Sequence, residues 1–351
     1  FDKELAILYS SGTTGKPKCI CHRAGGVLLQ HLKEHKLHCN VKPGDNVFYF
    51  TTCGWMMWNW LISALASKAT IFLYDGSPFF PTKESIIQMV DIEEINYLGV
   101  SAKYLDALRN EKFSAIDKFN LDSLKCILST GSPLIKESFE YVYRNLKSDI
   151  HLASISGGTD IVSCFVLGIP HLPVFSGEIQ CRSLGVDVDI FDDDGKSTNE
   201  KGELVCKSAL PTMPIGFWND DKKIKYIQSY YSKFKNVWTQ GDFANFTNNN
   251  GIVIYGRSDA TLNPGGIRIG TAEIYRSVET INEVVESIAV AQEWNNDIRI
   301  VLFVKLSEGN KLTNELIKLI KDKIREQTSI RHVPAKVIKI MDIPKTKSGK
   351  I

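Results

Sequence analysis

The chain has 351 residues, of which 43% are hydrophobic and 23% charged, so it is long enough to bury a core in each of two domains. Lysine and arginine number 42 against 40 acidic residues, with no block of one sign, which does not favour nucleic acid or an anionic membrane as a partner. The longest apolar run, 55–66, contains Asn59 and is too short to span a bilayer, so no membrane insertion is expected.

Eight cysteines are scattered along the chain without paired Cys-x-x-Cys motifs, which argues against structural zinc and against a disulfide framework. A reducing compartment is therefore expected, and we predict a cytosolic location. The chain begins at Phe1, almost inside one motif, and ends directly after another. We expect from this that it is a fragment of a longer protein that continues at both ends.

The first two thirds of the chain alternate between strand-like and helix-like segments. Residues 5–9 predict a strand, followed by a glycine-rich loop and a helix over 24–36. Such alternation predicts an α/β fold with a parallel sheet. Further predicted strands are 46–51, 69–74, 97–100 and 125–128, and predicted helices include 82–91 and 136–146.

From 177 to 256 short strands alternate with turn signals such as Asp193-Asp194-Gly195, which indicates a β-rich subdomain. After Arg257 helical and strand patterns return and predict a compact α/β unit of about 90 residues. Its predicted segments are 272–282, 284–292, 298–306, 313–327 and 335–341. We expect a large domain over 1–258 and a smaller, mobile domain over 259–351.

The string from Tyr9 to Lys18 has the composition of a phosphate-binding loop. Its glycines let backbone N–H groups approach an anion, its hydroxyls donate hydrogen bonds, and its lysines supply charge. It is not a Walker loop, because two residues separate Gly12 from Gly15 and a proline follows Lys16. The alternative is an ordinary Ser/Gly surface loop. The residues expected to bind phosphate are Ser10, Ser11, Gly12, Thr13, Thr14, Gly15, Lys16 and Lys18.

This loop resembles the signature of the adenylate-forming superfamily, which comprises acyl-CoA synthetases, luciferases and peptide-synthetase adenylation domains. Residues 156–160, Ser-Gly-Gly-Thr-Asp, resemble its Thr-Glu motif. The resemblance implies that Thr159 contacts a nucleotide phosphate and that Asp160 helps to hold Mg²⁺, although Asp160 is one methylene shorter than the family's glutamate. The alternative is a glycine-rich turn with a helix cap.

Two further stretches resemble nucleotide-binding motifs of the superfamily. In 238–242, Trp-Thr-Gln-Gly-Asp, the carboxylate of Asp242 suits the two ribose hydroxyls. In 255–259 the resemblance implies that Arg257 reaches the ribose or a phosphate and that Asp259 is the hinge between the domains. Residues at the position of the family's adenine contacts are Gly131, Ser132 and Pro133.

The remaining motifs lie near the end of the chain. By resemblance, Gly266 lies near the pantetheine tunnel and Arg268 near the α-phosphate. Lys350, in the string Pro-Lys-Thr-Lys-Ser-Gly-Lys, matches the C-terminal lysine that stabilises charge on the carboxylate and the α-phosphate. Arg325 lies at the distance from Lys350 at which acetyl-CoA synthetases carry a CoA-binding arginine; alternatively it is a basic residue on an exposed helix face.

Two features of the sequence bear on which carboxylic acid the resemblance implies as the substrate. Acetyl-CoA synthetases carry a tryptophan two residues before the motif threonine, and Gly157 stands at that position, which implies room for an acid larger than acetate. The Trp/Met-rich segment 51–60, together with 154–160 and 177–180, looks like the acetoacetyl-CoA synthetases within this superfamily. Alternatively, the tryptophans and methionines of 51–60 belong to the hydrophobic core. The expected acyl-pocket residues are Met56, Met57, Thr130 and Gly157.

The resemblance implies a ligase that uses ATP, Mg²⁺ and CoA. Acetoacetate would attack the α-phosphorus to give acetoacetyl-AMP and pyrophosphate, and the small domain would then rotate about Asp259 and admit the CoA thiol. Thr159, Arg268 and Lys350 are the expected catalytic residues. The alternatives are another short- or medium-chain acyl-CoA synthetase, an adenylation domain that loads a carrier protein, and an inactive nucleotide-binding fragment.

Overall fold

The computed structural model describes residues 1–10, 17–258, 262, 269–294 and 297–345. Within it the chain divides into two compact units. The first contains Phe1–Gln240 and Ala244–Ile254, and the second contains Gly241–Phe243 and the residues from Tyr255 onward. The predicted domain boundary between 258 and 259 stays a prediction, because residues 259–261 lie outside the described part of the chain.

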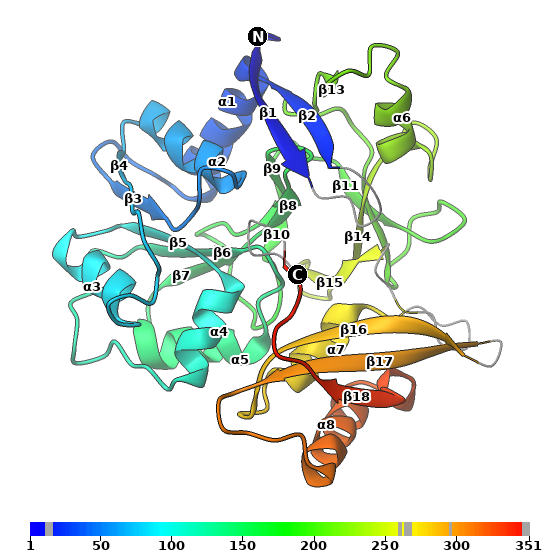
Figure 1. Cartoon of the computed structure of the whole chain (residues 1–351). Coiled ribbons are helices and arrows are strands. Elements are labelled where there is room, and N and C mark those ends of the chain that lie inside the picture. The colour runs from blue at the N-terminus through cyan, green and yellow to red at the C-terminus, as the bar shows by residue number, and fades with distance from the viewer. Residues whose placement is uncertain (11–16, 259–261, 263–268, 295–296, 346–351) are drawn as a thin grey trace. The chain divides into compact units, whose positions relative to one another are not determined.

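The centre of the first unit is a five-stranded parallel sheet (Figure 1). Its order is β4-β3-β5-β6-β7, and its three innermost strands consist mostly of buried residues because both faces are covered. The strands are β3 (Asn46–Tyr49), β4 (Thr70–Phe72), β5 (Tyr97–Ser101), β6 (Cys126–Thr130) and β7 (His151–Ser154). The predicted parallel α/β layout is confirmed here.

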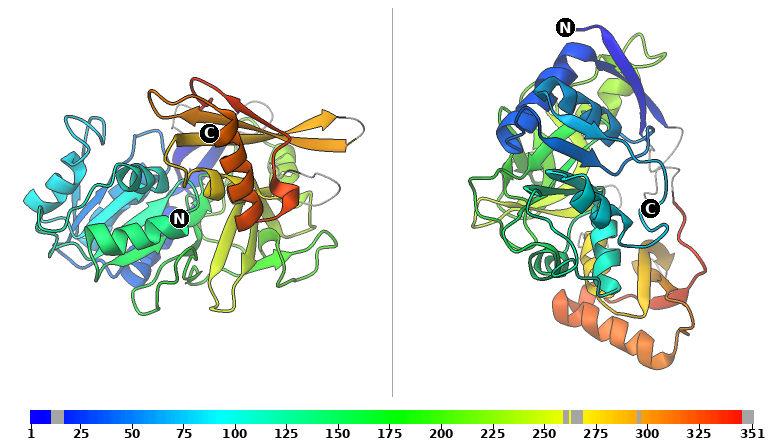
Figure 2. Two further views of the ribbon diagram at one scale, coloured as in Figure 1. Left: turned by 90° about the horizontal axis from the view of Figure 1, so that it is seen from below. Right: turned by 90° about the vertical axis from the view of Figure 1, so that its left-hand side faces the viewer.

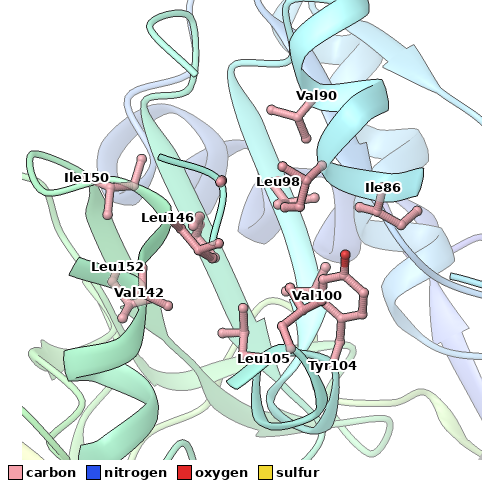
Figure 3. Close-up of a cluster of buried hydrophobic side chains, with 14 of the residues drawn as sticks. Ile86, Val90, Leu98, Val100, Tyr104, Leu105, Val142, Leu146, Ile150 and Leu152 are labelled. Atoms are coloured by element: carbon pink, nitrogen blue, oxygen red, sulfur yellow. The ribbon is translucent and has the colours of Figure 1, made fainter. Parts of the chain in front are cut away.

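Helices pack on both faces of this sheet. On one face, Leu98 and Val100 of β5 lie among apolar side chains of α3, α4 and η3, for example Ile86, Leu105 and Val142 (Figure 3). On the other face, Met57 and Trp60 of α2 belong to a second core with Val27 and Leu128. The helices concerned are α2 (Met57–Ser63), η2 (Ala64–Ser67), α3 (Ser85–Ile92), α4 (Ala102–Asn110), α5 (Lys136–Tyr141) and the π-helical η3 (Val142–Leu146).

The start of the chain differs from the predicted order of strand, loop and helix. A second strand follows the loop, so β1 (Glu4–Ser10) and β2 (Lys18–Arg23) pair antiparallel with Ser10 opposite Lys18. The predicted helix then begins at once, as α1 (Ala24–Lys33) and the π-helical η1 (Glu34–His38). Strand β2 was missed because only a short apolar stretch separates the loop from the helical pattern.

The β-rich region is confirmed, with one helix that the sequence did not predict. Strands β8, β9 and β10 form one antiparallel sheet, β11, β12, β14 and β15 another, and β13 joins β2. The unpredicted helix α6 (Ile224–Tyr231) buries Tyr226 and Tyr230 in a core with Trp238. The strands are β8 (Ser156–Gly158), β9 (Ser163–Leu167), β10 (Cys181–Arg182), β11 (Val188–Phe191), β12 (Gly202–Cys206), β13 (Gly216–Phe217), β14 (Trp238–Phe246) and β15 (Ile252–Arg257).

The second unit is a small α/β structure, as predicted. Its sheet has the order β16-β17-β18, and α8 lies along one face of it, with Ile320 and Ile324 packed among residues such as Leu302 (Figure 2). The elements are α7 (Thr271–Val278), β16 (Val284–Trp294), β17 (Asp297–Leu306), α8 (Asn314–Gln327), η6 (Ile330–His332) and β18 (Lys336–Lys339). No helix in the described part of the chain has the length and apolar character needed to cross a membrane.

Candidate active site

Two of the predicted motifs begin at the same edge of the parallel sheet. Strands β6 and β7 are parallel neighbours, so their carboxyl ends lie side by side, where ligands bind in open α/β sheets. The hydroxyl of Thr130, at the end of β6, donates to the carbonyl of Ile155, just after β7, over 2.9 Å. The segment 131–133 and the motif 156–160 therefore leave the sheet next to each other.

Gly131 makes this exit possible. Its φ of +92° lies in the left-handed region, which glycine adopts without a steric penalty. A Cβ at this position would lie 3.6 Å from the indole of Trp55, so Trp55 covers Gly131 at ordinary contact distance. Trp55 also packs edge-to-face on Tyr49, with ring centroids 5.9 Å apart. Trp55 is thus a candidate site residue beyond those predicted; its place in the segment 51–60 was the available signal.

The motif residues Thr159 and Asp160 lie in the turn that joins β8 to β9. Backbone bonds from Ile161 N to Gly158 O (3.3 Å) and from Val162 N to Thr159 O close this turn. Both Thr159 and Asp160 are partly exposed, whereas the two residues after them are buried. The alternative of a helix cap is not what this stretch forms, because the turn connects two antiparallel strands.

The carboxylate of Asp160 meets Lys18, the last residue of the predicted phosphate-binding string. Lys18 Nζ lies 2.5 Å from Asp160 Oδ1, and the hydroxyl of Tyr230 donates to the same oxygen over 2.7 Å. The side chains of Lys18 and Asp160 are 27% and 15% exposed, so solvent only partly screens the pair. Ser10, opposite Lys18 in the strand register, has a buried hydroxyl without a partner among the described residues. These groups could bind a phosphate together.

Tyr230 was not predicted as a site residue, yet it holds this cluster together. Its ring stacks on Trp238, with centroids 3.8 Å apart and planes 14° apart, and Lys18 Nζ lies 4.7 Å from the ring centre. Trp238 Nε1 donates to Gln240 Oε1 over 3.3 Å, and Gln240 Nε2 donates to Gly157 O over 3.2 Å. The available signal was the run of tyrosines in α6, one helical turn apart.

His22 lies on β2 and is buried. Burial lowers the pKa of His22 to about 4, because a low dielectric disfavours the charged imidazolium, while the negative charge of Asp160 acts in the opposite direction. At neutral pH the cation beside Asp160 is therefore Lys18 rather than His22.

Within the second unit the structure brings together two predicted nucleotide-binding residues. Arg257 NH1 lies 3.5 Å from Asp242 Oδ1, and Asp242 is buried. Gly241 has a φ of +89°, and a Cβ there would lie 2.6 Å from the Arg257 guanidinium. Glycine therefore serves both the backbone conformation and the close approach of Arg257.

Gly157 has a structural role beside the one predicted. A Cβ at this position would lie 2.0 Å from Ser163 O and 2.6 Å from Cys164 Cα, both backbone atoms of β9. Strand packing against β9 is therefore a second reason for a glycine at this position, beside the room for a larger acid that the resemblance implies. The participation of Gly157 in the pocket stays a prediction.

Three other predicted residues have ordinary structural environments. Met56 and Met57 are 6% and 2% exposed and belong to the core around Trp60. Arg325 lies in the last turn of α8, is half exposed, and pairs with Asp322 over 3.0 Å. Their roles in the acyl pocket and in CoA binding stay predictions. The predicted residues outside the described part of the chain are Ser11, Gly12, Thr13, Thr14, Gly15, Lys16, Asp259, Gly266, Arg268 and Lys350.

The donor set around Asp160 fits a nucleotide-bound magnesium ion. Among the described residues no group of three or more His, Cys, Asp or Glu side chains could hold a metal. Magnesium commonly binds through one or two carboxylates together with substrate phosphates and water. Asp160 offers one carboxylate, paired with Lys18, so the ion would arrive with the phosphates rather than occupy a preformed cage.

Comparison with known proteins agrees with these features. The family model described as AMP-binding enzyme matches residues 2–215. Acetoacetyl-coenzyme A synthetase of Rhizobium meliloti is 57% identical over 352 residues, covering 100% of this chain and 54% of the relative. Acetoacetyl-CoA synthetase of Mus musculus is 48% identical over 354 residues, with 100% and 52% coverage. The chain thus spans about half the length of these relatives.

Solved structures confirm the predicted fold class. Acetoacetyl-CoA synthetase from Streptomyces lividans superposes with a TM-score of 0.93 at 42% identity, covering 99% of this chain and 54% of that one. A benzoate CoA ligase from Burkholderia xenovorans, at 19% identity, has a TM-score of 0.80 over 100% of this chain and 68% of its own. The predicted resemblance to acetoacetyl-CoA synthetases is confirmed in sequence and in fold. From these matches and from the motifs that meet at Asp160, we conclude that the chain belongs to the AMP-binding enzyme family.

Proposed function

We propose that the protein containing this chain is an AMP-forming acid–thiol ligase that acts on acetoacetate. Acetoacetate attacks the α-phosphorus of ATP and displaces pyrophosphate, and the thiol of CoA then displaces AMP from the acyl-adenylate. The observation that carries the proposal is the ion pair of Lys18 with Asp160, which joins the phosphate loop to the second motif. The choice of acid is supported by the relatives at 57% and 48% identity, which are acetoacetyl-CoA synthetases.

The described residues have definite tasks in this proposal. Lys18 and Ser10, whose hydroxyl has no partner among the described residues, bind the β- and γ-phosphates. Lys18 exchanges the Asp160 carboxylate for phosphate oxygens as the nucleotide arrives. Asp160 is then available to Mg²⁺, whose charge offsets that of the triphosphate. Thr159, next to it in the turn, contacts a phosphate through its hydroxyl. The catalytic contribution is positioning and electrostatic stabilisation.

The nucleoside and the α-phosphate are assigned by the other motifs. Gly131, Ser132 and Pro133, at the carboxyl edge of the sheet, contact adenine beside the Trp55 indole. Asp242 accepts hydrogen bonds from the ribose hydroxyls and is oriented by Arg257. Arg268 and Lys350 stabilise charge on the α-phosphate, and Gly266 and Arg325 bind CoA after a rotation about Asp259. These last assignments rest on the motif resemblance.

Two other activities fit the same phosphate site. A short- or medium-chain acyl-CoA synthetase would differ only in its acid, because Lys18, Asp160 and Asp242 contact no acyl group in this scheme. An adenylation domain that loads a carrier protein would differ only in its thiol.

A substrate panel with the full-length protein separates these possibilities. Pyrophosphate release is measured with acetoacetate, acetate, butyrate and 3-hydroxybutyrate, and the nucleotide product is identified. We expect AMP and pyrophosphate with acetoacetate as the preferred acid, and thioester only when CoA is added. Formation of ADP would refute the mechanism, and a preference for another acid would refute the assigned substrate.

A further inference from the structure

The turn that carries Asp160 ends in a residue with an unfavourable backbone conformation. Val162 has a φ of +45°, in the left-handed region that β-branched residues rarely adopt. It is 1% exposed and directly precedes β9. Such a conformation persists only where surrounding contacts impose it. Asp160 lies two residues earlier in the same turn, so the backbone conformation at Val162 bears on where the turn places Asp160.

The contact that holds Val162 comes from a buried histidine on α1. His31 is 0% exposed, and its Nε2 lies 2.6 Å from Val162 O. A carbonyl oxygen only accepts hydrogen bonds, so Nε2 carries the proton and Nδ1 is the acceptor. Ser63 Oγ lies 2.9 Å from Nδ1 and can donate its single proton either to Nδ1 or to Trp60 O. This arrangement fixes both the tautomer and the ring orientation of His31.

A second histidine extends the network behind Ser63. His35 Nε2 lies 3.0 Å from Ser63 Oγ and 3.0 Å from Trp60 O, and it donates to both. The Ser63 hydroxyl proton is shared between His31 Nδ1 and Trp60 O, which lies 2.7 Å away. The hydrogen bonds therefore form a chain that runs from His35 through Ser63 and His31 to the carbonyl of Val162.

The next residue of the turn is anchored to the same helical segment. Ser163 Oγ donates to Glu34 Oε1 over 2.5 Å, and Trp60 Nε1 donates to Glu34 Oε2 over 2.9 Å. Glu34 and His31 follow β2 along the chain, and β2 begins with Lys18. One continuous segment therefore carries Lys18 at one end and holds the Asp160 turn at the other.

We propose that His31 is a positioning residue for Asp160: its hydrogen bond to Val162 holds the β8–β9 turn in the left-handed conformation that directs the carboxylate to Lys18. This rests on the proposed function in that Asp160 serves Mg·ATP. His31 contacts no substrate itself.

The test is a set of variants in the full-length protein, for which we measure the kinetic constants and the hydrogen-exchange rates of the amides at 159–163. His31→Phe keeps an aromatic ring at this position and removes the hydrogen-bond donor. We expect the KM for Mg·ATP to rise about tenfold, the value of one hydrogen bond, with the KM for acetoacetate changing less than about twofold. Exchange in the turn should accelerate by a similar factor. His31→Gln, whose amide nitrogen reaches the Nε2 position, should behave like the wild type.

Val162→Gly supplies the decisive double-mutant cycle. Glycine adopts a positive φ freely, so Val162→Gly in the His31→Phe background should recover most of the lost affinity for Mg·ATP. The matched control is His38→Phe, because His38 is another buried histidine that donates to a carbonyl, Gly168 O at 2.9 Å, away from the turn. A double variant no better than His31→Phe, or an equal effect of His38→Phe, would overturn the proposal.

Ser63→Ala tests the same idea if His31→Phe does not fold. It removes the hydrogen-bond partner of His31 Nδ1 and leaves the His31 ring in place. We expect faster exchange at 159–163, and unchanged exchange there would overturn the positioning role. The exchange readout needs no turnover, so it decides the positioning role even if the protein proves not to act on acetoacetate.

Discussion

Lys18 Nζ lies 2.5 Å from Asp160 Oδ1, although 142 positions separate the two residues in the chain. Lys18 is the first residue of β2, and Asp160 lies in the turn between β8 and β9. The pair joins the end of a phosphate loop to the carboxylate assigned to Mg²⁺. Each partner has a second task in the proposed reaction, so the pair should dissociate when Mg·ATP binds.

Asp160→Asn tests the carboxylate. The amide has the same shape but no charge, so it neither pairs with Lys18 nor binds Mg²⁺ effectively. We expect kcat/KM for Mg·ATP to fall on the order of 100-fold, measured by pyrophosphate release across a magnesium titration. Asp160→Glu, which restores the superfamily's acid, should retain most of the activity. An unchanged magnesium dependence in Asp160→Asn would contradict the assignment.

Tyr230→Phe tests the hydroxyl that donates to Asp160. The variant keeps the ring stacked on Trp238, so its melting temperature should change little, while the lost bond should lower kcat/KM for Mg·ATP by about tenfold. Tyr231→Phe is the matched control, because its hydroxyl interacts with Met213 Sδ, at 3.8 Å, and with Tyr226 rather than with Asp160. Equal losses in the two variants would refute a specific role for Tyr230.

Gly157→Ala tests whether strand packing requires the glycine. The added Cβ would lie 2.0 Å from Ser163 O, so β8 and β9 must separate, and we expect destabilisation of about 1–3 kcal/mol or more. Gly54→Ala is the control, since nothing lies within 4 Å of a Cβ there. Urea unfolding of both variants gives the comparison. A Gly157→Ala protein as stable as Gly54→Ala would show that the site tolerates a side chain.

Stability should fall in mild acid because of buried histidines. Burial lowers the pKa of His35 to about 3 and that of His38 to about 4, whereas in the unfolded chain both should titrate near 6.5. Between these values the unfolded state binds more protons, so the unfolding free energy decreases as the pH falls below about 6.5. Each histidine contributes roughly 1.4 kcal/mol per pH unit in that window.

Urea unfolding at pH 7, 6 and 5 measures this slope. His35→Gln keeps a donor but does not titrate, so its slope should be smaller by the contribution of one proton. A slope that does not change in His35→Gln would show that His35 does not titrate in this window on unfolding.

Much of the fold could be read from local patterns. Alternating apolar runs and helical periods identified β3 to β6, α3 and the second unit, because strand and helix periods are properties of neighbouring residues. Strand β2 and helix α6 were missed. The first is short and adjoins a loop, and the second lies in a region dominated by turn signals, where tyrosines packed on Trp238 decide the structure.

The candidate site likewise has features that the sequence predicted and features that only the tertiary structure shows. The sequence by itself identified the family and predicted a phosphate loop and a motif at 156–160, because glycines, hydroxyls and charges at fixed spacing are properties of neighbouring residues. Only the tertiary structure decided that Lys18 meets Asp160, that Tyr230 joins them, and that His31 hydrogen-bonds the carbonyl of Val162. It also decided that Gly157 is required by β9. These contacts join segments far apart in the chain, and their direction depends on packing and burial, which no local pattern records.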